Sequence, residues 1–195
     1  IKLKKFDSLN EKIIKKKYPI ILWNHRWEYD KNPELFFNTL IKIKKMGIKF
    51  YLIVLGEEFD TEMNIFTYAR NYFKNEIIHF GYSTTFENYR RLLWSSDIIP
   101  VTSMQEFFGI SVMEAVYCNT YPLLPKQLTY PELFNYKDNP EIFYDDENDF
   151  QEKLINTIKS INILNSDKFR QIASNYDWRN IINEYDDIFD SLNFN

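Results

Sequence analysis

Glycine and cysteine are scarce in this chain, which has four glycines and one cysteine among 195 residues. The single cysteine, Cys118, can form neither an intrachain disulfide nor a cysteine zinc cluster, and it favours a reducing compartment, the cytoplasm or the nucleus. The sequence contains no G-x-G-x-x-G or Walker pattern. A glycine-lined dinucleotide site or P-loop is therefore excluded.

Long apolar runs are missing as well. No run approaches the length of a membrane span, and residues 1–12 (IKLKKFDSLNEK) have no signal-peptide core. The formal net charge of −4 argues against a basic nucleic-acid binder, although a local basic patch stays compatible with it. Because 45% of the residues are hydrophobic, the chain should fold. We expect one soluble, intracellular domain that makes no membrane contact.

Short apolar runs alternate with helical patterns along the chain. Strands are expected at residues 20–23, 50–55, 77–80, 98–101, 121–124 and 142–144. Helices are expected at 33–46, 61–74, 85–96, 109–118 and 150–161, with two more within 167–192. This alternation implies right-handed crossovers between parallel strands. The predicted fold class is α/β, a Rossmann-like, doubly wound parallel sheet.

Ligands in such sheets bind at the carboxyl ends of the strands, where loops lead into helices. The loops to search are 24–32, 56–60, 81–84, 102–108 and 125–130. The first carries Arg26 and Lys31 just before the helix start Asn32-Pro33-Glu34. Arg26 can hold two phosphate oxygens with its planar fork, and Lys31 can add a point charge. The alternative is that both are solvated loop charges.

Residues 102–116 (TSMQEFFGISVMEAV) contain two acids, Glu106 and Glu114, with seven residues between them. Glu106 lies in the loop after a strand, whereas Glu114 lies on the following helix, so they could accept hydrogen bonds from hydroxyls at two points along one ligand. A helix beginning at Gly109 would favour a phosphate between them. On spacing alone, a capping acid and a solvent-facing helix acid explain the pattern equally well.

The sequence context of the two acids resembles the E-x7-E motif of retaining family 4 glycosyltransferases, which have the GT-B fold. Similar segments surround it in the same order: residues 94–98 (WSSDI), Ser103, residues 121–123 (YPL), and residues 176–178 (YDW) with Tyr185. The likeness covers residues 19–190. The chain departs from it at Asn119, where the family usually has glycine; since asparagine tolerates a left-handed helix cap, we expect the geometry to survive.

Within that family, four segments resemble the tRNA-queuosine α-mannosyltransferase group: residues 23–28 (WNHRWE), 30–34 (DKNPE), 106–109 (EFFG) and 130–133 (YPEL). Other members usually have a Gly-Arg-Leu turn in place of His25-Arg26-Trp27. The group transfers mannose from GDP-mannose to queuosine in aspartate tRNA. An acceptor that is a glycolipid or polysaccharide, or a non-catalytic nucleotide-sugar-binding module, is the alternative.

The resemblance implies that this chain is the C-terminal, donor-binding half of a GT-B enzyme, inactive by itself. A tRNA acceptor would be bound mainly by a missing N-terminal half. The implied divisions are an N-terminal extension or linker (1–18), a nucleotide-sugar-binding domain (19–166) and closing C-terminal helices (167–195). No D-x-D pattern or histidine cluster occurs, so we expect no metal and no cofactor besides the donor substrate GDP-mannose.

The resemblance also implies roles for individual residues. Arg26 and Lys31 would bind the diphosphate, Glu114 the ribose, and Glu106 the transferred hexose; Arg26, Lys31 and Glu106 form the implied catalytic set. The implied donor-binding set is Arg26, Lys31, Gly56, His79, Ser103, Glu106, Phe108, Gly109, Ile110 and Glu114. The loop of residues 79–82 would meet the base, Trp23 and Trp27 could serve as stacking platforms, and Tyr130 and Glu132 could close the site. The alternatives are structural: a satisfied structural histidine at His79, packing for Trp23 and Trp27, and a helix start for Tyr130 and Glu132.

Overall fold

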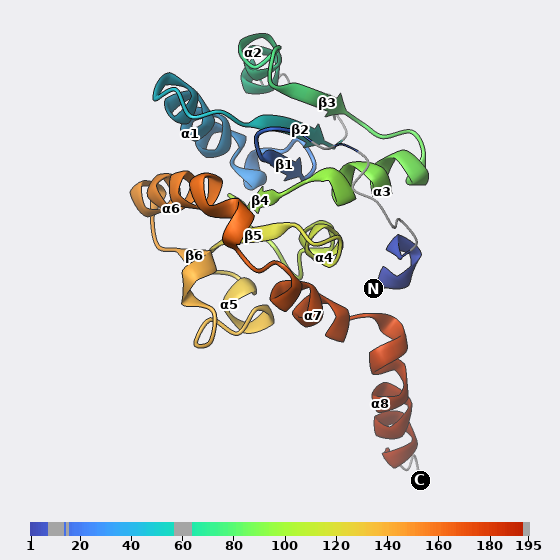
Figure 1. Ribbon diagram of the computed structural model, residues 1–195. Helices are drawn as coiled ribbons and strands as arrows, with labels where there is room; N and C mark the ends of the chain where they lie inside the picture. Colours follow the sequence, from blue (N-terminus) through green and yellow to red (C-terminus); the bar gives the residue numbers. More distant parts are fainter. Residues whose placement is uncertain (8–13, 15, 57–63, 193–195) are drawn as a thin grey trace.

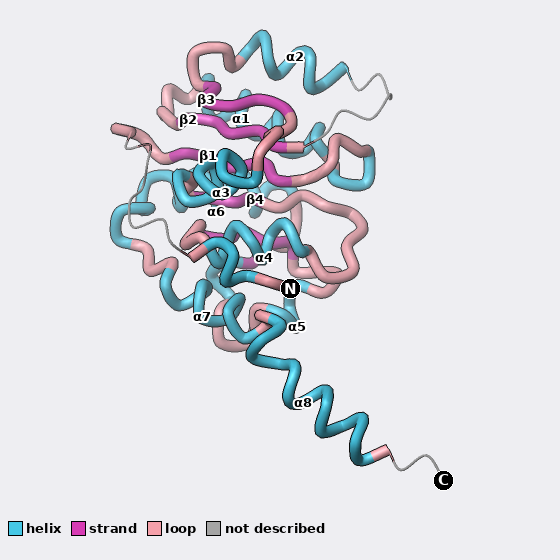
Figure 2. The backbone as a smooth tube through the Cα atoms, turned by 90° about the vertical axis from the view of Figure 1, so that its right-hand side faces the viewer, coloured by secondary structure: helices cyan, strands magenta, loops and turns pink. Residues whose placement is uncertain are grey.

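Among the residues that a computed structural model of the chain describes, six parallel strands form the sheet, and helices cover both of its faces (Figure 1, Figure 2). The structure describes residues 1–7, 14, 16–56 and 64–192. The strand order is β3-β2-β1-β4-β5-β6, so the winding reverses between β1 and β4. The strands are β1 (Ile20–Asn24), β2 (Tyr51–Leu55), β3 (Ile77–Gly81), β4 (Ile98–Pro100), β5 (Tyr121–Pro125) and β6 (Phe143–Tyr144). The predicted fold class is confirmed.

The helices begin and end within a few residues of their predicted bounds. They are α1 (Pro33–Lys45), α2 (Asn64–Tyr72), α3 (Phe86–Ser95), α4 (Ile110–Tyr117), α5 (Tyr130–Leu133), α6 (Glu147–Ser160), α7 (Asp167–Asn175) and α8 (Trp178–Ser191), with single 3-10 turns η1 (Leu3–Phe6), η2 (Tyr29–Lys31), η3 (Pro140–Ile142) and η4 (Ile161–Ile163). Residues 57–60 of the second predicted loop and 61–63 of the following predicted helix lie outside the described residues. Asn119 has a φ of 70°, so the left-handed cap expected there is kept.

Alternate side chains of β1 and β2 enter two separate cores, as the two-residue repeat of a strand requires. Ile20 and Leu22 of β1 pack in the core that contains side chains of α3, α4 and α7. Ile21 and Trp23 pack on the other face, in the core that α1, α2 and α6 cover. Burial on both faces explains why the strands read as continuous apolar runs.

The beginning of the described chain and the start of α8 are joined by backbone hydrogen bonds. The N–H groups of Leu3 and Lys4 donate to Asp177 Oδ2 at 2.6 and 2.9 Å, and the Trp178 N–H donates to the Ile1 carbonyl at 2.7 Å. Leu3 is fully buried, so the segment assigned to an N-terminal extension adds to the core. We call this junction of residues 1–4 and 177–178 the clasp.

The last two helices differ in their packing. α7 lies against α4 and contributes buried side chains, whereas α8 projects away from the sheet and has no buried residue (Figure 1). In the described part of the chain, no helix combines the length and apolar character needed to cross a bilayer.

Candidate functional site

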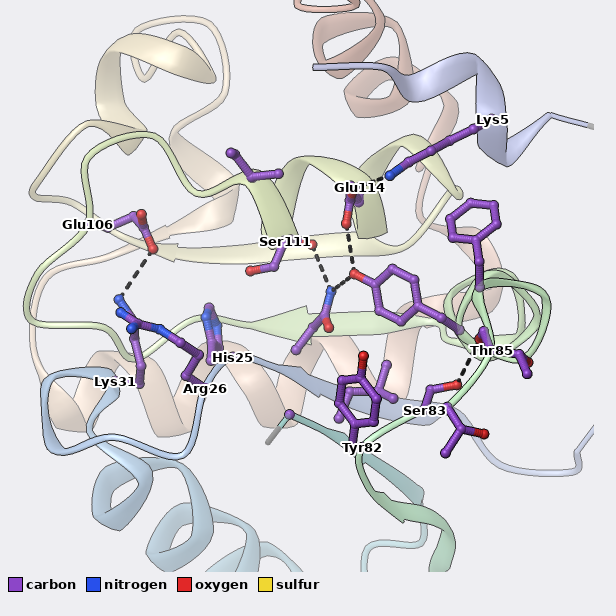
Figure 3. Close-up of a pocket in the computed structure, with 17 residues that line it drawn as sticks. Lys5, His25, Arg26, Lys31, Tyr82, Ser83, Thr85, Glu106, Ser111 and Glu114 are labelled. Atoms are coloured by element: carbon purple, nitrogen blue, oxygen red, sulfur yellow. Dashed lines mark hydrogen bonds and ion pairs between the residues drawn. The ribbon is translucent and has the colours of Figure 1, made fainter. Parts of the chain in front are cut away.

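A cavity of about 670 Å³ opens at the carboxyl edge of the sheet (Figure 3). It lies beside the reversal between β1 and β4, where open α/β sheets bind ligands. Its walls come from η1, the ends of β1 and β2, the segment between β1 and α1, the loops before α3 and α4, and residues of α3 and α4. Six members of the predicted donor-binding set line it: Arg26, Lys31, Gly56, Glu106, Ile110 and Glu114.

One end of the cavity, which we call the charged end, contains Arg26, Lys31 and Glu106. The Lys31 ammonium is almost enclosed, with its side chain 9% exposed. Its Nζ donates to the Gln105 carbonyl at 2.9 Å and lies 3.0 Å from Asp30 Oδ2 and 3.4 Å from Glu106 Oε2. Two loops that are far apart in sequence therefore share one buried cation.

Backbone contacts fix these two loops to each other. The Met104 N–H donates to the Asp30 carbonyl at 2.7 Å, and the Thr102 hydroxyl donates to the Lys31 carbonyl at 2.8 Å. These bonds satisfy backbone groups that leave the sheet at adjacent strand ends. They place Lys31 beside Glu106 before any ligand binds.

Arg26, by contrast, is open to solvent. Its side chain is 60% exposed and its Nη1 pairs with Glu28 Oε1 at 2.9 Å. Such an exposed pair contributes little, about 0–1 kcal/mol, because water screens it. The guanidinium can therefore exchange Glu28 for an anionic ligand at small cost.

The loop carrying Arg26 passes close to the end of β2, which only glycine at position 56 permits. Gly56 has a φ of +132°, and a Cβ there would lie 2.2 Å from the His25 carbonyl oxygen and 2.8 Å from the Trp27 ring. Trp23 Nε1 donates to the His25 carbonyl at 3.0 Å, and Trp27 Nε1 donates to the Leu55 carbonyl at 3.3 Å. The two indoles are buried and hold the turn, which is the packing role left open above.

Glu106 is held as a carboxylate. Its partial burial would raise the pKa, but Lys31 and the backbone N–H groups of Gly109 and Phe108 outweigh burial and lower the pKa below its ordinary value. The Phe107 N–H also donates to Glu106 Oε1 at 3.1 Å. The acid therefore keeps a negative charge beside the buried cation.

His25 lies between the two ends of the cavity. Its ring is buried edge-on against Trp23, and Nε2 has no hydrogen-bond partner among the described residues. Burial and the charge of Lys31 lower the pKa of His25 to about 4. The ring is accordingly neutral at neutral pH.

The other end of the cavity, which we call the network end, contains Asn24, Tyr89 and Glu114. Asn24 Nδ2 donates to the Tyr89 hydroxyl at 3.0 Å and to the Ser111 carbonyl at 2.9 Å. The Tyr89 hydroxyl donates to Glu114 Oε2 at 2.8 Å. Burial, and next the neighbouring charge of Glu114, raise the pKa of Tyr89, so the phenol stays protonated.

A side chain from the N-terminal segment reaches this end as well. Lys5 Nζ lies 3.2 Å from Glu114 Oε1, and it also lies over the Phe6 and Phe86 rings, 4.9 and 5.1 Å from their centroids. Figure 3 shows Lys5 entering from the side opposite Arg26 and Lys31. The cavity is thus bounded by cations at both ends.

Four residues of the predicted donor-binding set lie outside the cavity wall: His79, Ser103, Phe108 and Gly109. The His79 ring bonds the Gly81 carbonyl through Nε2 at 3.0 Å, and Ser103 is fully buried. The Phe108 ring packs edge-on against Tyr176, with 5.5 Å between centroids. Gly109 precedes α4 with a φ of +78°, and a Cβ there would meet the Tyr130 ring at 3.1 Å. Their assignment to donor binding stays a prediction.

The other lining residues were not in the predicted donor-binding set. Asn24 and His25 lie in the predicted loop 24–32, and Tyr82, Ser83 and Thr84 lie in the predicted loop 81–84. Outside the predicted loops are Lys5, Leu55, Thr85, Phe86, Tyr89 and Ser111. In the sequence, Tyr89 occupies an apolar position of a helix, and no local pattern indicates that its hydroxyl forms hydrogen bonds in the cavity. Within the ranges that the structure describes, no group of three or more His, Cys, Asp or Glu side chains could hold a metal ion. Metal-independent binding remains a prediction.

Comparison with known proteins gives a consistent family. The family described as "Glycosyl transferases group 1" matches residues 5–176. The "tRNA-queuosine alpha-mannosyltransferase" of Drosophila melanogaster is 29% identical over 188 residues. That match covers 94% of this chain and 47% of the relative, so the chain spans about half the length of the relative.

Solved structures with low sequence identity share the fold. A glycosyltransferase from Rickettsia africae ESF-5 matches with a TM-score of 0.78 at 17% identity, over 100% of this chain and 56% of the other. The C-terminal domain of a glycosyl transferase group 1 family protein (LpcC) from Francisella tularensis matches with a TM-score of 0.60 at 20% identity, over 88% of both chains.

Proposed function

The chain belongs to the glycosyl transferases group 1 family, and from that premise we propose that it is the nucleotide-sugar-binding domain of a retaining glycosyltransferase. It corresponds in extent to about half of the Drosophila relative and to most of a solved C-terminal domain, which supports assigning it to the C-terminal half. The acceptor would then bind mainly to the other half of the enzyme.

The observation that carries this proposal is that Arg26, Lys31 and the two acids Glu106 and Glu114 line one cavity at the switch point of the sheet. In glycosyl transfer from a nucleotide sugar, negative charge builds on the departing diphosphate. Positioned cations stabilise that charge where it forms. Arg26 and Lys31 supply the cations, the first through a planar fork and the second as a point charge.

The two acids are assigned to the two sugars of the donor. Glu106, beside Lys31, holds the transferred hexose and faces the positive character that develops at its anomeric carbon. Glu114, at the network end, accepts hydrogen bonds from the ribose hydroxyls. The diphosphate would lie between these two acids, beside Arg26 and Lys31.

The donor that we propose is GDP-mannose, and the acceptor is queuosine in aspartate tRNA. This assignment rests on the segments around Arg26, Glu106 and Tyr130 described in the sequence, and on the likeness to the Drosophila relative. The net charge of −4 agrees with RNA contact through the other half of the enzyme.

The donor assignment is tested by titrating the chain with GDP, GDP-mannose and guanosine in a calorimeter. Arg26→Ala should weaken GDP roughly 10–100-fold, the range for losing a charge-assisted hydrogen bond, and leave guanosine within about twofold. Arg70→Ala is the matched control, because Arg70 contacts the Phe80 ring away from the cavity. Equal losses for GDP and guanosine, or no GDP binding by a folded wild-type chain at millimolar ligand, would remove the assignment.

The acceptor assignment needs the full-length enzyme. Radiolabelled mannose from GDP-mannose should enter aspartate tRNA that contains queuosine and not the same tRNA with guanine at that position. The isolated chain should transfer none. Transfer to both tRNAs, or by the isolated chain, would contradict the assignment.

A further inference from the structure

The Tyr89 hydroxyl has its hydrogen-bond direction fixed on both sides. An amide nitrogen can only donate, so Asn24 Nδ2, which donates to the Ser111 carbonyl with one hydrogen, donates the other to the Tyr89 oxygen. The hydroxyl hydrogen is thereby left for Glu114 Oε2, 2.8 Å away. The order of donors is set by the backbone carbonyl of Ser111 on α4.

This order determines which oxygen of Glu114 a ligand would meet. Oε2 is engaged by a half-buried phenol, whereas Oε1 carries the ion pair with Lys5, a side chain that is 47% exposed. Lys5 can move into solvent at small cost, since exposed ion pairs contribute little. Tyr89 cannot move in this way, because its ring packs against Phe6 and Phe86.

We propose that Tyr89 is a positioning residue for nucleoside recognition. Together with Asn24 it fixes the Glu114 carboxylate so that Oε1 is presented to a pair of ribose hydroxyls once Lys5 moves aside. This inference rests on the proposed function, in which Glu114 binds ribose. A freely rotating carboxylate would lose side-chain entropy on binding, and the fixed one has already lost it.

The competing explanation is that Tyr89 only links α3 to α4. Both explanations predict a loss of stability when the hydroxyl is removed, so melting temperature does not separate them. They differ in ribose discrimination, defined as the affinity for GDP divided by the affinity for 2′,3′-dideoxy-GDP. A purely structural link changes both affinities by the same factor.

The experiment measures both affinities by calorimetry for wild type, Tyr89→Phe, Asn24→Ala and Glu114→Ala. Wild type should prefer GDP roughly 10–100-fold, as expected for hydroxyls that donate to a carboxylate. Tyr89→Phe should lower that ratio at least about fivefold while dideoxy-GDP stays within about twofold. Tyr144→Phe is the matched control, because it removes another buried phenol hydrogen bond, the one to the Val101 carbonyl at 2.7 Å, and should keep the wild-type ratio.

The possible outcomes distinguish failure of the positioning role of Tyr89 from failure of the proposed function. A wild-type ratio kept by Tyr89→Phe but lost by Glu114→Ala overturns the positioning role and leaves the proposed function standing. A wild-type chain without discrimination, or Glu114→Ala with the wild-type ratio, overturns both. If Tyr89→Phe does not fold, Asn24→Ala frees the phenol to rotate and should lower the ratio in the same direction; an unchanged ratio there overturns the inference. In the double variant Tyr89→Phe, Glu114→Ala, no further loss beyond Glu114→Ala is expected.

Discussion

The two ends of the cavity both present polar side chains, but they differ in the elements that carry these side chains and in the contacts that hold them. The charged end places Arg26 and Glu106 on loops and Lys31 at the end of the 3-10 turn η2, and acids of the chain itself pair both cations. The network end places Asn24 at the end of a strand and Tyr89 and Glu114 on helices, joined by hydrogen bonds of 2.8 and 3.0 Å.

The two ends therefore differ in how firmly packing fixes their side-chain geometry. Groups held on regular elements keep their geometry because packing fixes their rotamers. At the charged end the cations must exchange their present partners for a ligand, and Arg26 does so in solvent. We expect the network end to behave as a fixed template and the charged end to gain order on binding. Four substitutions test this expected difference between the two ends of the cavity.

The largest effect is expected for Gly56→Ala. The new methyl would meet the His25 carbonyl, so the loop of the charged end must shift, and we expect a loss of roughly 4 kcal/mol or more in the free energy of unfolding. Urea unfolding followed by circular dichroism measures it. Gly81→Ala is the control, because Gly81 has a similar φ of +126° and no atom of the described residues lies within 4 Å of the added Cβ. Equal losses at both positions would assign the effect to backbone strain instead of the clash.

Lys31→Met should break the charged end without moving its backbone. The change removes the cation from Asp30 and Glu106 and from a bound diphosphate, and we expect roughly 100-fold weaker GDP binding, about 3 kcal/mol. Guanosine binding, which we assign to the network end, should change less than about threefold. Lys44→Met, which removes the pair with Glu76 on another part of the surface, is the control. A comparable loss for guanosine would show that the two ends are not independent.

His25→Phe tests the region between the ends through pH. The unfolded chain takes up a proton near pH 6.5, whereas the folded chain does so near pH 4, so His25 makes stability fall as the pH falls from 7 to 5. We expect this fall to shrink by about 2 kcal/mol in His25→Phe, since one pKa unit corresponds to about 1.4 kcal/mol. Urea unfolding at pH 7 and pH 5 measures it. His79→Phe is the matched variant. The assignment would be contradicted if the fall in unfolding free energy between pH 7 and pH 5 were smaller than in wild type for His79→Phe and unchanged for His25→Phe.

The smallest effect is expected for Lys5→Met. Because half of the Lys5 side chain is exposed, we expect less than about 1 kcal/mol of lost stability. GDP binding should stay within about threefold of wild type, as the template formed by Tyr89 and Asn24 remains. A loss of more than tenfold would mean that the N-terminal segment is itself part of the template.

The sheet could be predicted from the sequence because burial on both faces makes its strands visible as apolar runs. The charged end could be predicted as well, since Arg26, Lys31 and Glu106 interrupt an apolar pattern. Tyr89 could not, because a tyrosine at an apolar helical position looks the same whether it packs or orients a carboxylate. Lys5 could not either: its approach to Glu114 spans 109 positions in sequence and depends on how the N-terminal segment packs.

The clasp between residues 1–4 and 177–178 also has a mechanical meaning. Tension that draws residue 3 away from residue 177 would load the hydrogen bonds to Asp177 before it reached the sheet. Lys5 follows immediately in the chain, so opening the clasp would also pull its ammonium away from Glu114. Tension on this short segment would thereby remove a positive charge from beside the Glu114 carboxylate in the cavity.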